Sequence, residues 1–192
     1  MRHLRKLAVY CGSAMGSDPV FADATRDTAA AMIRNGVDLV YGGGKLGLMG
    51  LVADTILEGG GKAFGVIPQA LVDIEVAHPR LTDLTIVDTM HERKAKMTEL
   101  ADAFVALPGG IGTLDELFEA WSWNALGYHA KPFCLLNVAG YWDGLIEFID
   151  HASVSGFMSP QRRAQLLVAS SAEEALHLLD EAAADATQGM TL

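Results

Sequence analysis

Glycines and an acidic residue stand together between Pro108 and Glu116, where the sequence is PGGIGTLDE. The apolar run at 103–107 that precedes this segment is typical of a buried strand, and residues 117–121 continue as a helical pattern. Backbone N–H groups at such a strand-to-helix turn can hold an anion, because they form the positive end of the helix. A phosphate cradle with a carboxylate beside it predicts chemistry on a phosphorylated sugar, with Glu116 as the reactive group.

Glu116 also has a purely structural interpretation. Thr113-x-x-Glu116 has the spacing of a capping box, in which Thr113 is the N-cap and Glu116 is the third helical residue that bonds back to it. Such a cap does not need the preceding Pro-Gly-Gly. The two roles are compatible, and we favour a catalytic Glu116 that also supports the start of the helix.

A second group of candidates begins at Met90, where the sequence is MHERKAKM. The group starts a predicted helix directly after a strand that ends at Val87, and a charged run of this kind is most often a solvated face. Arg93 and Lys94, however, are placed in the first turn, where the helix dipole disfavours cations. Their position predicts an anion nearby, and the forked guanidinium of Arg93 suits phosphate or carboxylate.

Two further glycine turns, at 11–16 (CGSAMG) and 42–50 (GGGKLGLMG), each follow a predicted strand. The second contains Gly42-x-Gly44-x-x-Gly47, a dinucleotide-binding pattern that is weak when it stands alone, and it lacks the spacing of a P-loop. The alternative interpretation is that its glycines serve only tight packing of a strand on a helix. Because parallel strands bind ligands beyond their carboxyl ends, three glycine turns at one edge favour contact with phosphate or ribose.

Apolar runs alternate with helical patterns, which predicts an α/β fold with an open, mostly parallel sheet covered by helices on both faces. The predicted strands are 6–11, 37–41, 63–67, 84–87, 103–107, 133–137 and, more weakly, 165–169. The predicted helices are 19–34, 48–58, 91–100, 114–126, 141–155 and 172–184. The stretch 67–83, which carries Glu75, His78 and Arg80, is predicted as a loop with one short helix. We expect one domain over residues 1–187 and a frayed tail at 188–192.

The composition limits the classes of function. The chain has 192 residues, 51% hydrophobic and 20% charged, with a net charge of −10, which is typical of a globular protein and disfavours a nucleic-acid polymer as partner. Cys11 and Cys134 fall at or in predicted buried strands, and neither they nor the histidines have metal-ligand spacing, so no metal site is expected. Because no segment has the length of a membrane span or a signal peptide, we expect a cytoplasmic protein without membrane contact.

The chain resembles the Lonely guy family of cytokinin riboside 5′-monophosphate phosphoribohydrolases, whose members have often carried the label lysine decarboxylase. The resemblance is carried by Met90-His91-x-Arg93-Lys94 and Pro108-Gly109-Gly110-x-Gly112-Thr113-x-x-Glu116. Further matches are Cys11-Gly12-Ser13, Gly42-Gly43-Gly44-x-x-Gly47-Leu48-Met49-Gly50, Gly65-Val66-Ile67-Pro68, Lys131-Pro132 and Leu136-Asn137-x-x-Gly140-Tyr141. Mild departures are Ala14, Asp115 and the segment 123–127, the last of which bears on base preference.

The resemblance implies a Rossmann-like fold, at least a homodimer with active sites near the subunit interface, and no metal or organic cofactor. It implies hydrolysis of the N-glycosidic bond of an N6-modified adenosine 5′-monophosphate to free base and ribose 5-phosphate, with Arg93 and Glu116 as the catalytic pair. The expected substrate-binding residues are Ser13, Gly43, Gly44, Met90, Lys94, Gly109, Gly110, Gly112 and Thr113.

This chemistry suits the residue types. Breaking the bond builds positive charge on the ribose, which a carboxylate at Glu116 stabilises while it orients or deprotonates water. Arg93 stays charged and therefore acts electrostatically. The proton donor to the base is left open between Asp115, Glu75 and solvent.

Two other functions stay open, namely a broader nucleoside-monophosphate nucleosidase and a non-catalytic nucleotide-binding module. The joint presence of Arg93 and Glu116 favours an enzyme over the module. The sequence does not distinguish the preferred base or N6 substituent, and it carries no motif for the Schiff-base lysine of a pyridoxal phosphate decarboxylase.

Overall fold

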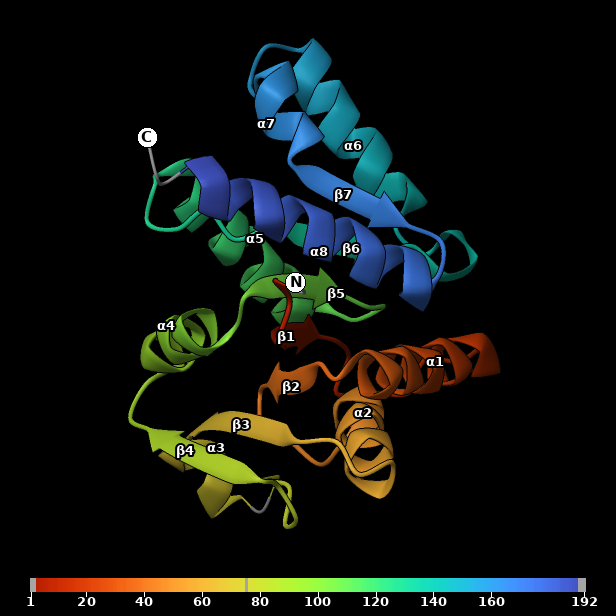
Figure 1. Cartoon of the computed structure of the whole chain (residues 1–192), viewed down its shortest axis with the longest axis vertical. Helices are drawn as coiled ribbons and strands as arrows, with labels where there is room; N and C mark the ends of the chain where they lie inside the picture. The colour runs from red at the N-terminus through yellow and green to blue at the C-terminus, as the bar shows by residue number, and fades with distance from the viewer. Residues whose placement is uncertain (1–2, 75, 190–192) are drawn as a thin grey trace.

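The computed structural model describes residues 3–74 and 76–189. Within these ranges seven strands form one parallel sheet in the order β4-β3-β2-β1-β5-β6-β7 (Figure 1). The strands are β1 (Lys6–Tyr10), β2 (Asp38–Tyr41), β3 (Ala63–Pro68), β4 (Asp83–Val87), β5 (Ala103–Ala106), β6 (Phe133–Leu136) and β7 (Leu166–Ala169). The helices are α1 (Pro19–Asn35), α2 (Gly47–Glu58), α3 (Gln69–Asp73), α4 (Met90–Leu100), α5 (Ile111–Ala125), α6 (Asp143–Val154), α7 (Pro160–Ala164) and α8 (Ala172–Gly189).

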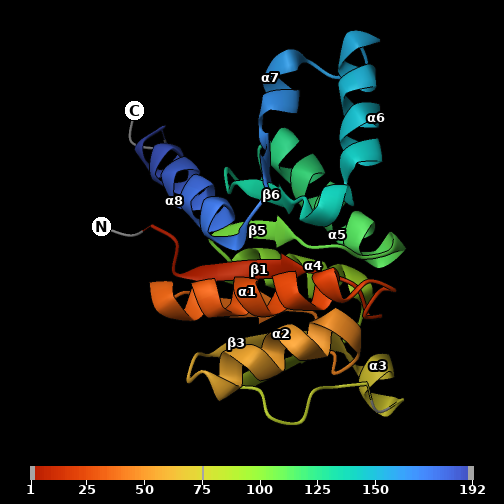
Figure 2. The ribbon, with the colours of Figure 1, turned by 90° about the vertical axis from the view of Figure 1, so that its right-hand side faces the viewer.

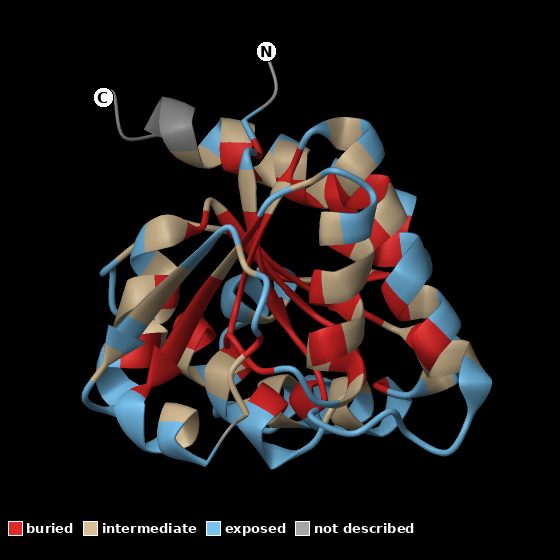
Figure 3. Ribbon diagram, turned by 90° about the horizontal axis from the view of Figure 1, so that it is seen from below, coloured by how far each residue is buried: buried red, intermediate tan, exposed pale blue. Residues whose placement is uncertain are grey.

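The sheet is covered on both faces, and two buried clusters fill the spaces between the layers (Figures 2 and 3). One cluster joins the sheet to α1, α2 and α8, and the other joins it to α4, α5 and α6. Every residue of β5 and β6 is buried, because a strand covered on both faces has no polar side. This is why these strands are unbroken apolar runs in the sequence.

The strand order reverses between β1 and β5. Strands β1 to β4 extend the sheet in one direction, and β5 to β7 extend it in the other. At such a switch point the loops that follow neighbouring strands diverge and leave a crevice beyond the carboxyl ends. The turn after β1 and the Pro-Gly-Gly turn after β5 meet at this edge, where the amide of Gly12 donates to the carbonyl of Pro108 over 3.1 Å, so the fold brings together two of the turns that the sequence singled out.

The predicted α/β fold with an open parallel sheet and helices on both faces is confirmed, and each predicted strand is present with its ends moved by at most one residue. The predicted short helix in the stretch 67–83 is α3. Helix α7 was not predicted, and α5 begins three residues earlier than expected. Helix α8 extends to Gly189, and the rest of the expected tail lies outside the described residues. None of the helices described is long and apolar enough to cross a bilayer.

Candidate active site

A cavity of about 510 Å³ opens at the switch point. All three glycine turns contribute to its wall, together with the first turns of α4 and α5 and the segment that follows β3. The lining residues are Cys11, Gly12, Ser13, Gly42, Gly44, Leu46, Met49, Ile67, Leu71, Val76, Met90, Arg93, Gly110, Ile111, Gly112, Thr113, Asp115 and Glu116. The cavity therefore has a backbone-rich end at α5 and an apolar wall on the side of β3 and α3.

Arg93 of α4 and Glu116 of α5 face each other in this cavity. The guanidinium Nη2 lies 3.5 Å from the carboxylate Oε1, and the two side chains are only 8% and 12% exposed. Nη1 of Arg93 lies 3.7 Å from the sulfur of Met90, while its buried Nε has no hydrogen-bond partner among the described residues. An enclosed guanidinium on the cavity wall is suited to an anionic group.

Gly42 makes the room that the guanidinium of Arg93 occupies. A Cβ atom built on Gly42 would lie 1.6 Å from Nη2 and 2.8 Å from Cζ of Arg93. Any other residue at position 42 would therefore displace the arginine. The sequence indicated a tight turn here, but it did not show that Gly42 belongs to the site.

Burial raises the pKa of Glu116 to about 7, and Asp115 adds to the rise while Arg93 and Lys94 oppose it. The ionised form loses hydration in this enclosed position, which disfavours it. A carboxyl group that titrates near neutral pH can take up or release a proton under physiological conditions. The environment of Glu116 therefore suits acid–base chemistry and is not that of a surface carboxylate.

The start of α5 corrects the predicted capping box. The helix begins at Ile111 with Gly110 as N-cap and no side-chain cap, so Thr113 is the third helical residue and Glu116 the sixth. This early start requires a glycine at position 109. A Cβ there would lie only 2.1 Å from Oγ1 of Thr113 and 2.8 Å from the amide nitrogen of Gly12. Thr113 is buried, and Glu116, which lies beyond the first turn, has no capping role.

The helix start supplies an anion site. The amide of Leu114 donates to the carbonyl of Gly110, and the amides of Ile111, Gly112 and Thr113 have no hydrogen-bond acceptor among the described residues. Three free N–H groups at the positive end of a helix, on the wall of a cavity, are suited to a phosphate.

The expected substrate-binding residues divide into two groups. Those that line the cavity are Ser13, Gly44, Met90, Gly110, Gly112 and Thr113. Gly43, Lys94 and Gly109 are not among the lining residues, and Gly109 borders a smaller neighbouring cavity of about 250 Å³. Lys94 bonds to Asp115, with 3.0 Å between Nζ and Oδ2, and also contacts Glu119. Its charge is therefore paired with carboxylates of α5, and its contact with substrate stays a prediction.

The remaining candidates have simple placements. Cys11 and Cys134 are buried free thiols, as the sequence predicted. Of the possible proton donors, Asp115 lines the cavity, and Glu75 lies outside the described residues. Among the described residues no group of three or more His, Cys, Asp or Glu side chains is placed to hold a metal ion. The apolar wall at Ile67, Leu71 and Val76 was not predicted, because only the folded chain brings these positions to the site.

A family model described as "Possible lysine decarboxylase" matches residues 49–179. The cytokinin riboside 5′-monophosphate phosphoribohydrolase LOG of Oryza sativa subsp. japonica is 45% identical over 177 residues, which are 92% of this chain and 73% of that protein. The enzyme LOG2 of Arabidopsis thaliana, which carries the same functional name, is 44% identical over 92% of this chain and 83% of its own length. The structure of a molybdenum cofactor binding protein from Rippkaea orientalis has the same fold, with a TM-score of 0.70, 19% identity and coverage of 93% of this chain and 96% of that one.

Proposed function

We propose, from the premise that the chain belongs to the Lonely guy (LOG) family of cytokinin riboside 5′-monophosphate phosphoribohydrolases, that it hydrolyses the N-glycosidic bond of adenosine 5′-monophosphates, including N6-modified ones, to free base and ribose 5-phosphate. The observation that supports this most strongly is the enclosed Arg93–Glu116 pair beside the free amides of α5. An anion site and a carboxylate of raised pKa then lie within one cavity.

The proposed mechanism assigns each end of the substrate to one part of the cavity. The phosphate binds the amides of Ile111, Gly112 and Thr113, which orients the ribose before any bond breaks. The ribose then lies at Arg93 and Glu116. The remaining apolar wall receives the base.

Cleavage of the bond between C1′ and the base nitrogen leaves the bonding electron pair on the base and positive charge on the ribose. Glu116 in its carboxylate form stabilises that charge, and it accepts a proton from the water whose oxygen attacks C1′. Arg93 holds its charge throughout, so it orients Glu116 and the substrate but does not transfer a proton. The departing base takes up one proton from solvent, and Glu116 returns to solvent the proton that it accepted from the attacking water, so the hydrolysis balances.

The first test is the dependence on the phosphate. We expect kcat/KM for AMP or N6-isopentenyl-AMP to exceed that of the matching nucleoside by about 100-fold or more, because each charge-assisted hydrogen bond to phosphate contributes about 1.5–3 kcal/mol. Pure protein is incubated with each matched pair, and the released base is quantified. Ribose 5-phosphate should inhibit competitively, whereas ribose should not. Equal rates on nucleoside and monophosphate would contradict phosphate recognition by α5.

The same assay, extended over a panel of nucleoside monophosphates, separates the alternatives. Release of base from AMP and from other monophosphates at similar kcat/KM would favour a broader nucleosidase. Binding of AMP without any release of base would favour a nucleotide-binding module, which does not need the Arg93–Glu116 pair.

We further propose that the protein is at least a homodimer. Large apolar side chains are exposed on and beside α5 and α6, among them Phe118, Leu126, Tyr128, Phe148 and Phe157, the last of which is 91% exposed. Apolar surface of this extent is typical of a protein interface. We expect light scattering at micromolar concentration to give a mass of at least twice the 20.4 kDa of one chain. A monomeric mass would contradict this proposal and a site shared between subunits.

A further inference from the structure

The segment that connects α3 to β4 is fastened to the second glycine turn. The amide of Lys45 donates to the carbonyl of Val76 over 2.8 Å, and the amide of His78 donates to the carbonyl of Gly43, also over 2.8 Å. Between these two bonds Gly44 and Ala77 form an isolated antiparallel bridge. This short stretch of backbone therefore lies alongside the second glycine turn, and the pairing fixes the position of Val76 at the cavity.

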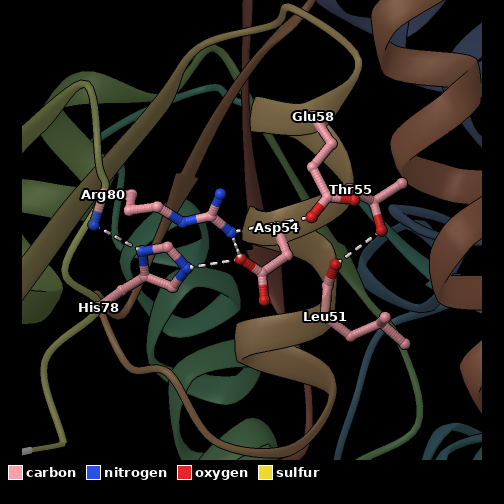
Figure 4. A network of polar contacts seen from close by, with 6 residues as sticks. All are labelled: Leu51, Asp54, Thr55, Glu58, His78 and Arg80. Carbon is pink, nitrogen blue, oxygen red and sulfur yellow. Dashed lines mark hydrogen bonds and ion pairs between the residues drawn. The ribbon is translucent and has the colours of Figure 1, made fainter.

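The side chain of His78 anchors this segment to α2. The ring is only 4% exposed, and its Nδ1 accepts a hydrogen bond from the amide of Arg80 over 3.2 Å. Because Nδ1 is an acceptor, the neutral ring carries its proton on Nε2, and Nε2 donates to Oδ1 of Asp54 over 3.2 Å (Figure 4). Both ring nitrogens are thus used, in one tautomer and one orientation.

A second contact between the same elements is much more exposed. The guanidinium of Arg80 contacts Asp54 and lies 3.8 Å from the carboxylate of Glu58, but its side chain is 57% exposed. Ion pairs in solvent contribute little to stability. Figure 4 shows that both contacts end on the same oxygen of Asp54. Because they come from different residues, substitution of His78 removes the buried bond and substitution of Arg80 removes the exposed pair.

The fastened segment supports the apolar wall of the cavity. Val76 and Leu71 line it, and the amide of Val76 donates to the carbonyl of Leu71 over 3.3 Å. This wall lies on the β3 side, away from the amides of α5, so it faces the base when the phosphate is bound at α5. No contact joins His78 directly to Arg93 or Glu116 among the described residues.

We propose that His78 is a positioning residue, which sets the affinity and selectivity for the base by holding the wall at Leu71 and Val76 through its bonds to Asp54 and Arg80. The proposal depends on the proposed function, because it requires that a base is the group that meets this wall. Since the bond-breaking groups are held by α4 and α5, the wall should affect KM and the choice of base and should leave kcat nearly unchanged.

The test compares His78→Ala, His78→Gln and Arg80→Ala. His78→Ala should raise KM for AMP about tenfold, the effect of one lost hydrogen bond, with kcat within about twofold and with unchanged inhibition by ribose 5-phosphate, which lacks the base. His78→Gln keeps an N–H donor near the position of Nε2 and should restore most of the affinity. Arg80→Ala is the matched control, because it removes the exposed ion pair but keeps the backbone amide, and it should behave as wild type.

A double substitution tests whether His78 acts through Asp54. Asp54→Ala should reproduce the rise in KM of His78→Ala, and the double variant should be no worse than either single variant. Asp54→Ala and His78→Gln both leave position 78 filled by a large side chain. If His78→Ala does not fold, these two variants replace it, with a raised KM expected for Asp54→Ala and a nearly unchanged KM for His78→Gln.

Hydrogen exchange gives a readout that does not need activity. The amides of Lys45 and His78 should exchange at least about tenfold faster in His78→Ala than in wild type, whereas the amide of Leu114 should keep its protection. If the wild-type protein releases no base from any nucleotide, the proposed function fails and this measurement still decides whether His78 holds the segment. Unchanged exchange at Lys45, or a loss of kcat at constant KM, would overturn the proposal.

Discussion

Replacement of Glu116 with glutamine should give a folded protein that binds AMP and releases its base at least about 100-fold more slowly, the scale of one positioned acid–base group. Glutamine keeps the size of the side chain but removes the charge that faces the ribose. Single-turnover release of base gives the chemical step, and calorimetric titration with AMP gives the binding constant. The two measurements separate catalysis from binding.

The structure simplifies the interpretation of this variant, because Glu116 is the sixth residue of α5 and caps nothing. A loss of activity in Glu116→Gln therefore cannot be ascribed to a weakened helix start. Asp115→Asn is the comparison variant, because Asp115 also lines the cavity and is a possible proton donor, but is 54% exposed and paired with Lys94. A smaller loss in Asp115→Asn than in Glu116→Gln would assign the central role to Glu116. A folded Glu116→Gln variant with wild-type turnover would remove the central residue from the mechanism and favour the binding module.

The pH dependence gives a second signature of the same group. Burial raises the pKa of Glu116 to about 7, and the mechanism uses the carboxylate, so kcat should rise as the pH rises through about 7 in the wild type. In Glu116→Gln the residual rate should lose this rise. A rate that falls through the same range would indicate that Glu116 acts as an acid.

The same shift has a consequence for stability. The pKa of Glu116 is higher in the folded chain than its ordinary value of 4.5, so its neutral form stabilises the fold and this contribution is lost as the pH rises from about 4.5 through about 7. Glutamine resembles the neutral form. Glu116→Gln should therefore gain stability relative to wild type with rising pH, by up to about 3 kcal/mol above pH 7. The site retains an ionisable carboxylate at a cost to the fold.

The strands could be predicted from the sequence because strands covered on both faces are continuous apolar runs, as in β5 and β6. The start of α5 could not. The local pattern Thr113-x-x-Glu116 satisfies a capping rule, but the approach of Gly109 to Gly12 lets the helix begin at Ile111. A contact between two turns about a hundred residues apart thus determines the start of the helix, and the capping-box rule, which considers only four consecutive residues, does not include it.

The site residues show the same limit. Arg93 and Lys94 are adjacent and both basic, so the sequence assigned both to an anion. Successive residues on a helix point about 100° apart, and only Arg93 faces the cavity while Lys94 bonds to Asp115. His78 has no ligand spacing in the sequence, because its partner Asp54 lies 24 positions away and is brought near only by the packing of the segment on α2.

The close approach of Gly42 to Arg93 leads to the other large expected effect. Gly42→Ala should lower kcat about 100-fold, comparable to the loss of one preorganised electrostatic group, because the new methyl group occupies the position of Nη2. The displaced atoms are the far end of a flexible side chain and the Cε of Met49, so the melting temperature should change by no more than about 4 °C. Activity should thus be lost without unfolding.

Two comparisons test whether the loss acts through Arg93. In the double variant Gly42→Ala/Arg93→Ala, kcat should be no lower than in Arg93→Ala alone, since the methyl group then has no guanidinium to displace. Gly144→Ala in α6 is the control for a glycine-to-alanine change, because a Cβ there would meet nothing within 4 Å, and it should keep kcat within a few-fold. If the effects of Gly42→Ala and Arg93→Ala multiply, the glycine acts on some other part of the site, and Arg93 does not depend on the space at position 42.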